Sequence, residues 1–236
     1  MVKISIAIPT WESYGNGEQF LDDLLRTIEI QTFKDFEVVI SDHSEDDYLL
    51  PKIKEFDDKF EIKYHKNENN RGNGSANTNN AISKCSGDII KIMFQDDFFY
   101  DDEALEKIYY ALTDSDKMWL LNGTNHTKDD GNSFYWDLYP KFNDKLLDGV
   151  NTISSPSVVA FKRQSEIIFD ETLVYFMDID YYYGMRKKYG DPVFYGDIIV
   201  TNRFPHENSI SSNMQNKEKM MSVESKYCFK KYGVES

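Results

Sequence analysis

The first hundred residues alternate between two hydrophobic patterns, and this alternation limits the folds that the chain can adopt. Short apolar runs rich in β-branched residues predict buried strands, and apolar residues at helical spacing between them predict helices. The predicted strands are residues 4–8, 36–40, 62–65 and 89–94, and the predicted helices are residues 20–28, 53–60 and 76–85. Because a strand, a helix and a strand of these lengths form a parallel, right-handed unit, the pattern predicts an α/β fold: a mostly parallel, Rossmann-like central sheet flanked by helices.

The second half of the chain has a less regular pattern. We predict strands at residues 119–123, 157–161 and 194–201, and helices starting near residue 102 and at 178–188 and 217–232. A polar segment with inserted aromatic residues, 127–151, predicts a long loop or a lid. No repeat or low-complexity linker divides the chain, so we predict a single domain over residues 1–236 in two halves, 1–100 and 101–236.

The composition supports a globular protein and excludes some partners. Hydrophobic residues make up 40% of the 236 residues, enough for a core, and the formal net charge is −14. An acidic chain is unsuited to nucleic acid, which needs a basic surface, but it can still bind a nucleotide at a local site. The two cysteines, Cys85 and Cys228, lie far apart and predict neither a disulfide framework nor a zinc site.

Hydropathy indicates where the protein works. The chain starts without the charged segment and long apolar stretch of a signal peptide. No run approaches the roughly 18 apolar residues of a membrane-spanning helix. We therefore expect a cytoplasmic protein without a transmembrane segment.

Two adjacent carboxylates, Asp96 and Asp97, follow the predicted strand 89–94. A helix pattern begins near Asp102, so the two acids fall at the carboxyl end of a strand, where ligands bind in open α/β sheets. We expect both acids to be exposed at that edge. Two hard oxygen donors side by side suit Mg²⁺ or Mn²⁺, especially when phosphate oxygens supply further ligands. The alternative is a solvated turn, in which Asp is common.

Two further polar residues, Thr10 and Asp42, follow the first and second predicted strands. In a parallel sheet these strand ends share one edge with Asp96 and Asp97. Asp42 could accept a hydrogen bond from the N3–H of uracil, from another base edge or from a ribose hydroxyl; alternatively it is a turn or helix-capping residue. The first strand lacks a following Gly-x-Gly-x-x-Gly turn and the chain lacks a Walker loop, which disfavours dinucleotide and P-loop sites.

A series of short motifs, in order along nearly the whole chain, resembles glycosyltransferase family 2, whose members have the GT-A fold. Each motif is weak alone, but their order is specific. The motifs are residues 4–10, 31–33, 36–42, 70–72, 79–82, 87–90, 94–97, 169–171, 178–180 and 203–209.

The resemblance implies an inverting glycosyltransferase that uses a nucleotide-sugar donor, with a UDP-sugar favoured, and Mn²⁺ or Mg²⁺. Asp96 and Asp97 fall on the family's Asp-x-Asp motif, which holds ribose and metal. His206 falls where a third metal or diphosphate ligand is expected. The residues expected to contact the nucleotide sugar are Pro9, Thr10, Asp42, Arg71 and Asp96.

Asp178 falls where the family places its catalytic base, which takes the proton of the acceptor hydroxyl. At the start of predicted helix 178–188, the helix dipole favours its ionised form; the alternative is a plain helix N-cap. Trp136 and Asp180 are our candidates for acceptor binding, Trp136 by stacking on a sugar ring. The run 181–183 of three tyrosines could also stack on sugars or could belong to the core.

Three positions depart from the family pattern and leave the donor identity open. Gln95 stands where the motif usually has Asp, Thr78 where Arg is common, and Met177 where Glu usually precedes the base. These departures give some support to an alternative, a catalytically degenerate protein that binds glycans or serves as a scaffolding subunit. A nucleotidylyltransferase is disfavoured because residues 11–15 lack a Gly-rich, basic loop.

The expected activity is transfer of a sugar from a nucleotide-diphosphate donor to a hydroxyl of a glycan or glycolipid, as in polysaccharide biosynthesis. Under this prediction the first half, residues 1–100, binds the nucleotide sugar, and the second half, 101–236, binds the acceptor. A lipid-linked acceptor would bring the cytoplasmic protein to the periphery of a membrane. A homo-oligomer is left open.

Overall fold

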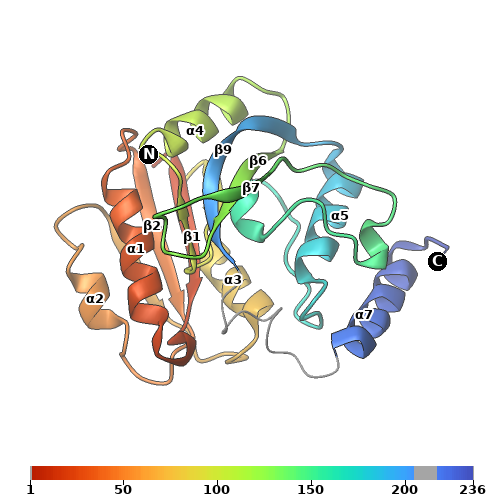
Figure 1. Ribbon diagram of the computed structural model, residues 1–236, viewed down its shortest axis with the longest axis horizontal. Helices are drawn as coiled ribbons and strands as arrows, with labels where there is room; N and C mark the ends of the chain where they lie inside the picture. Colours follow the sequence, from red (N-terminus) through yellow and green to blue (C-terminus); the bar gives the residue numbers. More distant parts are fainter. Residues whose placement is uncertain (1, 205–216, 236) are drawn as a thin grey trace.

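The computed structural model describes residues 2–204 and 217–235, which form one sheet with helices on both faces (Figure 1). Within these residues nine strands follow the order β3-β2-β1-β4-β8-β6-β9-β5, with β7 paired to β6. The strands are β1 (Ile4–Thr10), β2 (Phe36–Asp42), β3 (Ile62–Lys66), β4 (Ile89–Ile92), β5 (Asp97–Phe99), β6 (Trp119–Thr127), β7 (Tyr135–Leu138), β8 (Val159–Lys162) and β9 (Val193–Arg203). The helices are α1 (Gly17–Glu29), α2 (Leu50–Lys54), α3 (Gly74–Ser83), α4 (Ala104–Thr113), α5 (Met177–Tyr189) and α7 (Lys217–Tyr232), with short 3₁₀ helices η1 (Ser13–Gly15), η2 (Leu146–Asp148) and η3 (Pro156–Val158).

The sheet is parallel in its first half and mixed in its second. β1 pairs with β2 and β4, and β2 pairs with β3, all in parallel. β8 then runs antiparallel between β4 and β6, and β9 lies parallel to β6. The predicted α/β fold with a mostly parallel central sheet is therefore confirmed, with antiparallel strands added by the second half of the chain.

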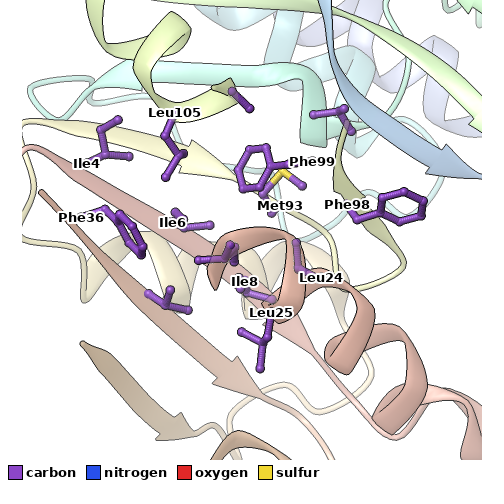
Figure 2. Close-up of a cluster of buried hydrophobic side chains, with 14 of the residues drawn as sticks. Ile4, Ile6, Ile8, Leu24, Leu25, Phe36, Met93, Phe98, Phe99 and Leu105 are labelled. Atoms are coloured by element: carbon purple, nitrogen blue, oxygen red, sulfur yellow. The ribbon is translucent and has the colours of Figure 1, made fainter. Parts of the chain in front are cut away.

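Alternation along β1 divides the core between the two faces of the sheet. Ile4, Ile6 and Ile8 project toward the face that α1, α2 and α4 cover, and Figure 2 shows these isoleucines among leucines of α1 and α4. Ala7 projects the other way, into a second core to which α3, α5 and α7 contribute. Strands covered on both faces read as continuous apolar runs, which explains why the first half of the pattern was easy to predict.

Several predicted boundaries change in the structure. The helix predicted at 53–60 overlaps only the end of α2, which starts at Leu50 and ends at Lys54, and the strand predicted at 89–94 ends at Ile92. The loop predicted at 127–151 was wrong in part, because Tyr135–Leu138 pairs with β6 as the strand β7. β5 was not predicted, since a three-residue strand is too short to show a periodic pattern.

Residues 2–204 and 217–235 include no helix that combines the length and the apolar character required to cross a lipid bilayer.

Candidate active site

The carboxyl ends of β1 and β2 and the turn after β4 meet at one edge of the sheet. Thr10 pairs with Asp42 in the parallel register of β1 and β2. The hydroxyl of Thr10 also donates to the side-chain oxygen of Gln95, which precedes the two acids. The structure thus brings together the three polar strand ends that the sequence placed at a common edge.

Gln95 is buried and ties the turn after β4 to the loop after β1. Its Oε1 accepts from the Trp11 backbone N–H at 2.8 Å, and its Nε2 donates to the Trp11 carbonyl at 3.0 Å. An aspartate here could accept but could not donate. This two-way pairing is a physical reason for the departure from the family motif at position 95.

Asp42 is fully buried and already fully hydrogen-bonded. Its Oδ1 accepts from the backbone N–H and hydroxyl of Ser44, at 2.8 and 2.6 Å. Its Oδ2 accepts from the Tyr64 hydroxyl at 2.8 Å and from Lys66 Nζ at 3.4 Å. The structure therefore shows the turn-capping role that the sequence also allowed, and binding of a base by Asp42 would require one of these donors to leave.

A buried polar network beside Asp42 was not predicted from the sequence. The Asn77 side chain of α3 donates to the Thr10 carbonyl at 3.0 Å and accepts from Ser41 Oγ at 2.6 Å. His43 Nε2 lies 2.9 Å from the Asn67 side-chain nitrogen. Burial, aided by the positive charge of the exposed Arg71, lowers the pKa of His43. The one feature of the sequence that could have indicated this network is Asn77, a polar residue on the buried face of a helix.

Asp97 is buried, which corrects the prediction that both acids are exposed at the sheet edge. It begins β5, which pairs with β9 so that Asp97 faces Asn202. Burial, and then the charge of Asp96, raise the pKa of Asp97 to about 7. Hydrogen bonds from Ser155 (2.9 Å), Ser157 and Asn202 act in the opposite direction. Asp96 itself is half-buried.

The carboxylate oxygens of Asp96 and Asp97 are ligands of the type that divalent cations prefer. Among the residues that the structure describes, no group of three or more His, Cys, Asp or Glu side chains is placed to bind a metal. Asp96 and Asp97 offer adjacent carboxylates whose mutual repulsion a cation would relieve, and a bound diphosphate can complete the oxygen ligands. His206, predicted as a further ligand, lies outside the described residues.

Asp178 lies in the first turn of α5 and is half-buried. Its Oδ2 accepts from Asn151 Nδ2 at 2.7 Å, and its Oδ1 accepts from the Ile179 N–H at 2.7 Å. Burial raises the pKa of Asp178 to about 7, and these hydrogen bonds oppose the shift. Burial therefore acts against the helix dipole, which favours the ionised form of Asp178.

Asp180 is placed differently from Asp178. It is buried, and its carboxylate accepts from Lys231 Nζ and from the Tyr232 hydroxyl of α7, both at 2.9 Å. This placement gives no support to acceptor binding by Asp180 and makes it an anchor for α7. Tyr181 and Tyr182 are also fully buried, so they belong to the core, the alternative that the sequence allowed.

Trp136 is an exposed aromatic side chain held in a strained backbone conformation. The side chain is 61% exposed and the residue has a φ of 49°, which is rare for a bulky residue. The register between β6 and β7 shifts here: Thr124 pairs with Leu138, and His126 pairs with Tyr135, which leaves an extra residue on β7. Such bulges re-aim side chains near functional sites.

The ring of Trp136 stacks on His126 with centroids 4.9 Å apart and an interplanar angle of 20°. His126 pairs in register with Asn202 of β9, and paired residues project from the same face of a sheet. The Asn202 side chain donates to Ser155 Oγ at 2.9 Å, the same hydroxyl that binds Asp97. The stacked rings of Trp136 and His126 therefore lie at the same end of the sheet as Asp97.

Arg203, next to Asn202, fastens this end of the sheet. Its side chain is buried and makes ion pairs with Asp23 of α1 at 2.7 Å and with Asp130 at 2.8 Å. It also donates to the backbone carbonyl of Asp96 at 3.3 Å. The motif at 203–209 begins next to Asn202, but no sequence pattern predicts that Asn202 contacts Asp97.

The structure resembles solved GT-A glycosyltransferases, so the predicted GT-A fold is confirmed. It superimposes on TarS 1-349 of S. aureus in complex with UDP with a TM-score of 0.69 and 19% identity, covering 94% of this chain and 65% of that chain. It also matches the mannosyltransferase PcManGT from Pyrobaculum calidifontis in complex with GDP-Man and Mn²⁺, with a TM-score of 0.62, 17% identity, and 86% and 57% coverage.

The sequence comparisons identify the family. The chain matches the model of Glycosyl transferase family 2 over residues 5–167, and it belongs to that family. It is 32% identical over 100 residues to the GalNAc(5)-diNAcBac-PP-undecaprenol beta-1,3-glucosyltransferase of Campylobacter jejuni. That match covers 41% of this chain and 30% of the relative, so the aligned part spans less than a third of that protein.

Proposed function

We propose that this protein is an inverting, metal-assisted glycosyltransferase that moves a sugar from a nucleotide-diphosphate donor to a hydroxyl of a glycan or glycolipid. The observation that supports it best is that one short segment, 151–155, contacts both acids that the reaction needs. Asn151 donates to Asp178 at 2.7 Å, and Ser155 donates to Asp97 at 2.9 Å. The segment thus links the acid expected near the acceptor to the acid expected near the diphosphate.

In this proposal Asp178 takes the proton of the acceptor hydroxyl while the acceptor oxygen attacks the anomeric carbon. A raised pKa, about 7, makes its carboxylate a stronger base than that of an ordinary aspartate. Asn151 and the Ile179 N–H hold its two oxygens in place. A single displacement from the side opposite the leaving group inverts the anomeric configuration.

Asp96 and Asp97 would hold Mn²⁺ or Mg²⁺, which stabilises the negative charge of the leaving diphosphate. The chain's own contribution is to orient Asp97 through Ser155 and Asn202 and to hold the Asp96 backbone through Arg203. Pro9, Thr10 and Arg71 remain candidates for nucleotide binding, as does Asp42 if it exchanges a partner.

The donor and acceptor classes are supported by what related proteins bind. TarS 1-349 has been solved with UDP and with UDP-GlcNAc, whereas PcManGT has been solved with GDP-Man and Mn²⁺. We favour a UDP-sugar donor. The Campylobacter relative is named for an undecaprenol-linked acceptor, which supports a glycolipid acceptor and a place at the membrane periphery. We expect that place to be on the cytoplasmic side. Trp136 would stack on a ring of the acceptor glycan.

The proposal is tested by ligand-induced stabilisation and turnover. We expect UDP with Mn²⁺ to raise the Tm more than UDP alone or GDP with Mn²⁺, because a ligand that binds only the folded state stabilises it. We also expect release of nucleoside diphosphate from UDP-glucose or UDP-GlcNAc, and loss of that release in Asp178→Asn. Nucleotide binding without turnover of any sugar nucleotide would favour the degenerate glycan-binding or scaffolding protein instead.

A further inference from the structure

Glu224 of α7 is a buried carboxylate that binds three successive backbone N–H groups just before α5. Its Oε1 accepts from Val174 at 3.0 Å, and its Oε2 accepts from Tyr175 at 2.8 Å and from Phe176 at 2.7 Å. Successive N–H groups that converge in this way form a concave site for an anionic group. In this protein the anion comes from a helix that lies some fifty residues further along the chain.

This contact orders the backbone that leads into α5. Phe176 is the N-cap residue of α5, and its side chain makes no capping hydrogen bond. The N–H of an N-cap residue has no partner within the helix and needs one from elsewhere. Glu224 accepts from this N–H and from the two N–H groups before it, and so fixes the backbone up to two residues before Asp178.

The same helix also holds the segment on either side of the Glu224 contact. Lys231 makes ion pairs with Asp170 at 2.8 Å and with Asp180 at 2.9 Å. The Tyr227 hydroxyl donates to Asp170 at 2.8 Å. The stretch 170–180, which contains Asp178, is therefore fastened to α7 at its start, its middle and its end.

We propose that Glu224 is a positioning residue for the Asp178 base, which makes α7 part of the catalytic apparatus. The inference rests on the proposed function, because it assigns Glu224 a role through Asp178. Loss of the three N–H contacts frees the backbone at 174–176, and a displacement of the base by about 1 Å is enough to slow a reaction by about 10²-fold. α7 lies beyond the part of the chain that matches the family model, residues 5–167.

The first test is Glu224→Gln, measured as UDP release from UDP-GlcNAc and UDP-glucose in the presence of Mn²⁺. Gln keeps the shape, but its Nε2 group would face an N–H donor and cannot accept from it. We expect kcat to fall roughly 10- to 100-fold while the KM for the donor changes by less than about twofold. Glu218→Gln is the matched control, because Glu218 is exposed on the same helix, and it should behave as wild type.

The second test separates positioning from a purely structural role. If Glu224 acts through Asp178, Glu224→Gln should cause little further loss of kcat in an Asp178→Asn background, because residues that act as one unit are not additive. An equal fold-loss in both backgrounds, or a lower Tm with normal kcat for the folded protein, would overturn the inference. Normal turnover by Asp178→Asn, or no turnover by the wild type, would instead overturn the proposed function.

Discussion

The side-chain amide of Asn79 pairs with the backbone of Phe169 in both directions. Its Nδ2 donates to the Phe169 carbonyl and its Oδ1 accepts from the Phe169 N–H, each at 2.9 Å. Asn79 belongs to α3, which packs on β1 and β2, whereas Phe169 opens the stretch that leads to Asp178. This pair therefore joins the half that carries the strand-end acids to the half that carries the proposed base. It gives a structural reason for the asparagine at the start of the motif at 79–82.

Asp178→Asn should remove most turnover and lower the stability only slightly. Asn can still accept from the Ile179 N–H, but it loses the hydrogen bond from Asn151 and cannot take a proton, so kcat should fall about 10²-fold or more while donor affinity persists. Asp180→Asn is the comparison: it weakens the contacts with Lys231 and Tyr232 but leaves the Asp178 carboxylate in place, so it should lower the Tm and reduce kcat much less than Asp178→Asn does. Steady-state kinetics and thermal unfolding of both variants test this prediction. If Asp180→Asn loses turnover and Asp178→Asn keeps it, the base is Asp180 and the assignment to Asp178 is wrong.

Asp178 and Asp97 should make stability fall as the pH rises from about 4 to 7 in the absence of metal. Each has a pKa of about 7 in the folded protein against an ordinary value of 3.8. Between these values the native state binds more protons than the unfolded state, so the free energy of unfolding decreases with rising pH. The pKa values of some other acids, such as Asp170, are lowered in the folded protein and have the opposite effect on stability. The contribution of Asp178 is therefore measured as the difference between the wild type and Asp178→Asn. Urea unfolding across this range should show a shallower decline for the variant; parallel curves would contradict the assignment.

Gln95→Asp, which restores the family motif, should destabilise the metal-free protein by about 1 kcal/mol. The Trp11 carbonyl loses its donor, and a third acid joins Asp96 and Asp97. Mn²⁺ should recover part of the loss because it neutralises this cluster. Thermal unfolding with and without Mn²⁺ measures both effects, and Gln164→Asp at an exposed position controls for the added charge. An unchanged Tm for Gln95→Asp would show that the two-way pairing is unimportant.

Asp42→Ala should lower the free energy of unfolding by about 1–3 kcal/mol, because the Ser44 N–H and the Tyr64 hydroxyl lose their acceptor in a buried site. If Asp42 only caps the turn, nucleotide binding should weaken equally for UDP and GDP. A selective loss of UDP binding at nearly normal stability would instead assign Asp42 to base recognition. Denaturant unfolding and nucleotide titration of the same variant distinguish the two roles.

Trp136→Gly should be more stable than Trp136→Ala by about 1 kcal/mol, because both lose the ring and only glycine adopts the positive φ without strain. Both variants should lose acceptor affinity while donor hydrolysis stays near wild type. The comparison separates the cost of the backbone strain from the benefit of the ring. Equal stability of the two variants would mean that the strain is negligible, and unchanged acceptor KM would remove Trp136 from the acceptor site.

The features that could be predicted from the sequence are those that depend on residues close together in the chain. The strands of the first half follow from short apolar runs rich in β-branched residues, and the turn-capping alternative for Asp42 follows from the preference of Asp for turns and helix caps. The burial of Asp97 could not be predicted, because it comes from the pairing with Asn202 in a strand that forms much later in the sequence. For the same reason no local pattern marked Glu224, whose three partners belong to another part of the fold.

β9 lies between β6 and β5 in the sheet, although it is the last of these strands to be synthesised. The surroundings of Asp97 therefore form in a definite order during protein synthesis. The parallel units β1, β2 and β4 leave the ribosome first, and Asp97 emerges with them as a solvated acid. Its pocket closes only when the residues from Val193 to Arg203 arrive and insert beside it. Contacts between segments so distant in sequence form late, so the strands of the first half are in place before the surroundings of Asp97 are complete.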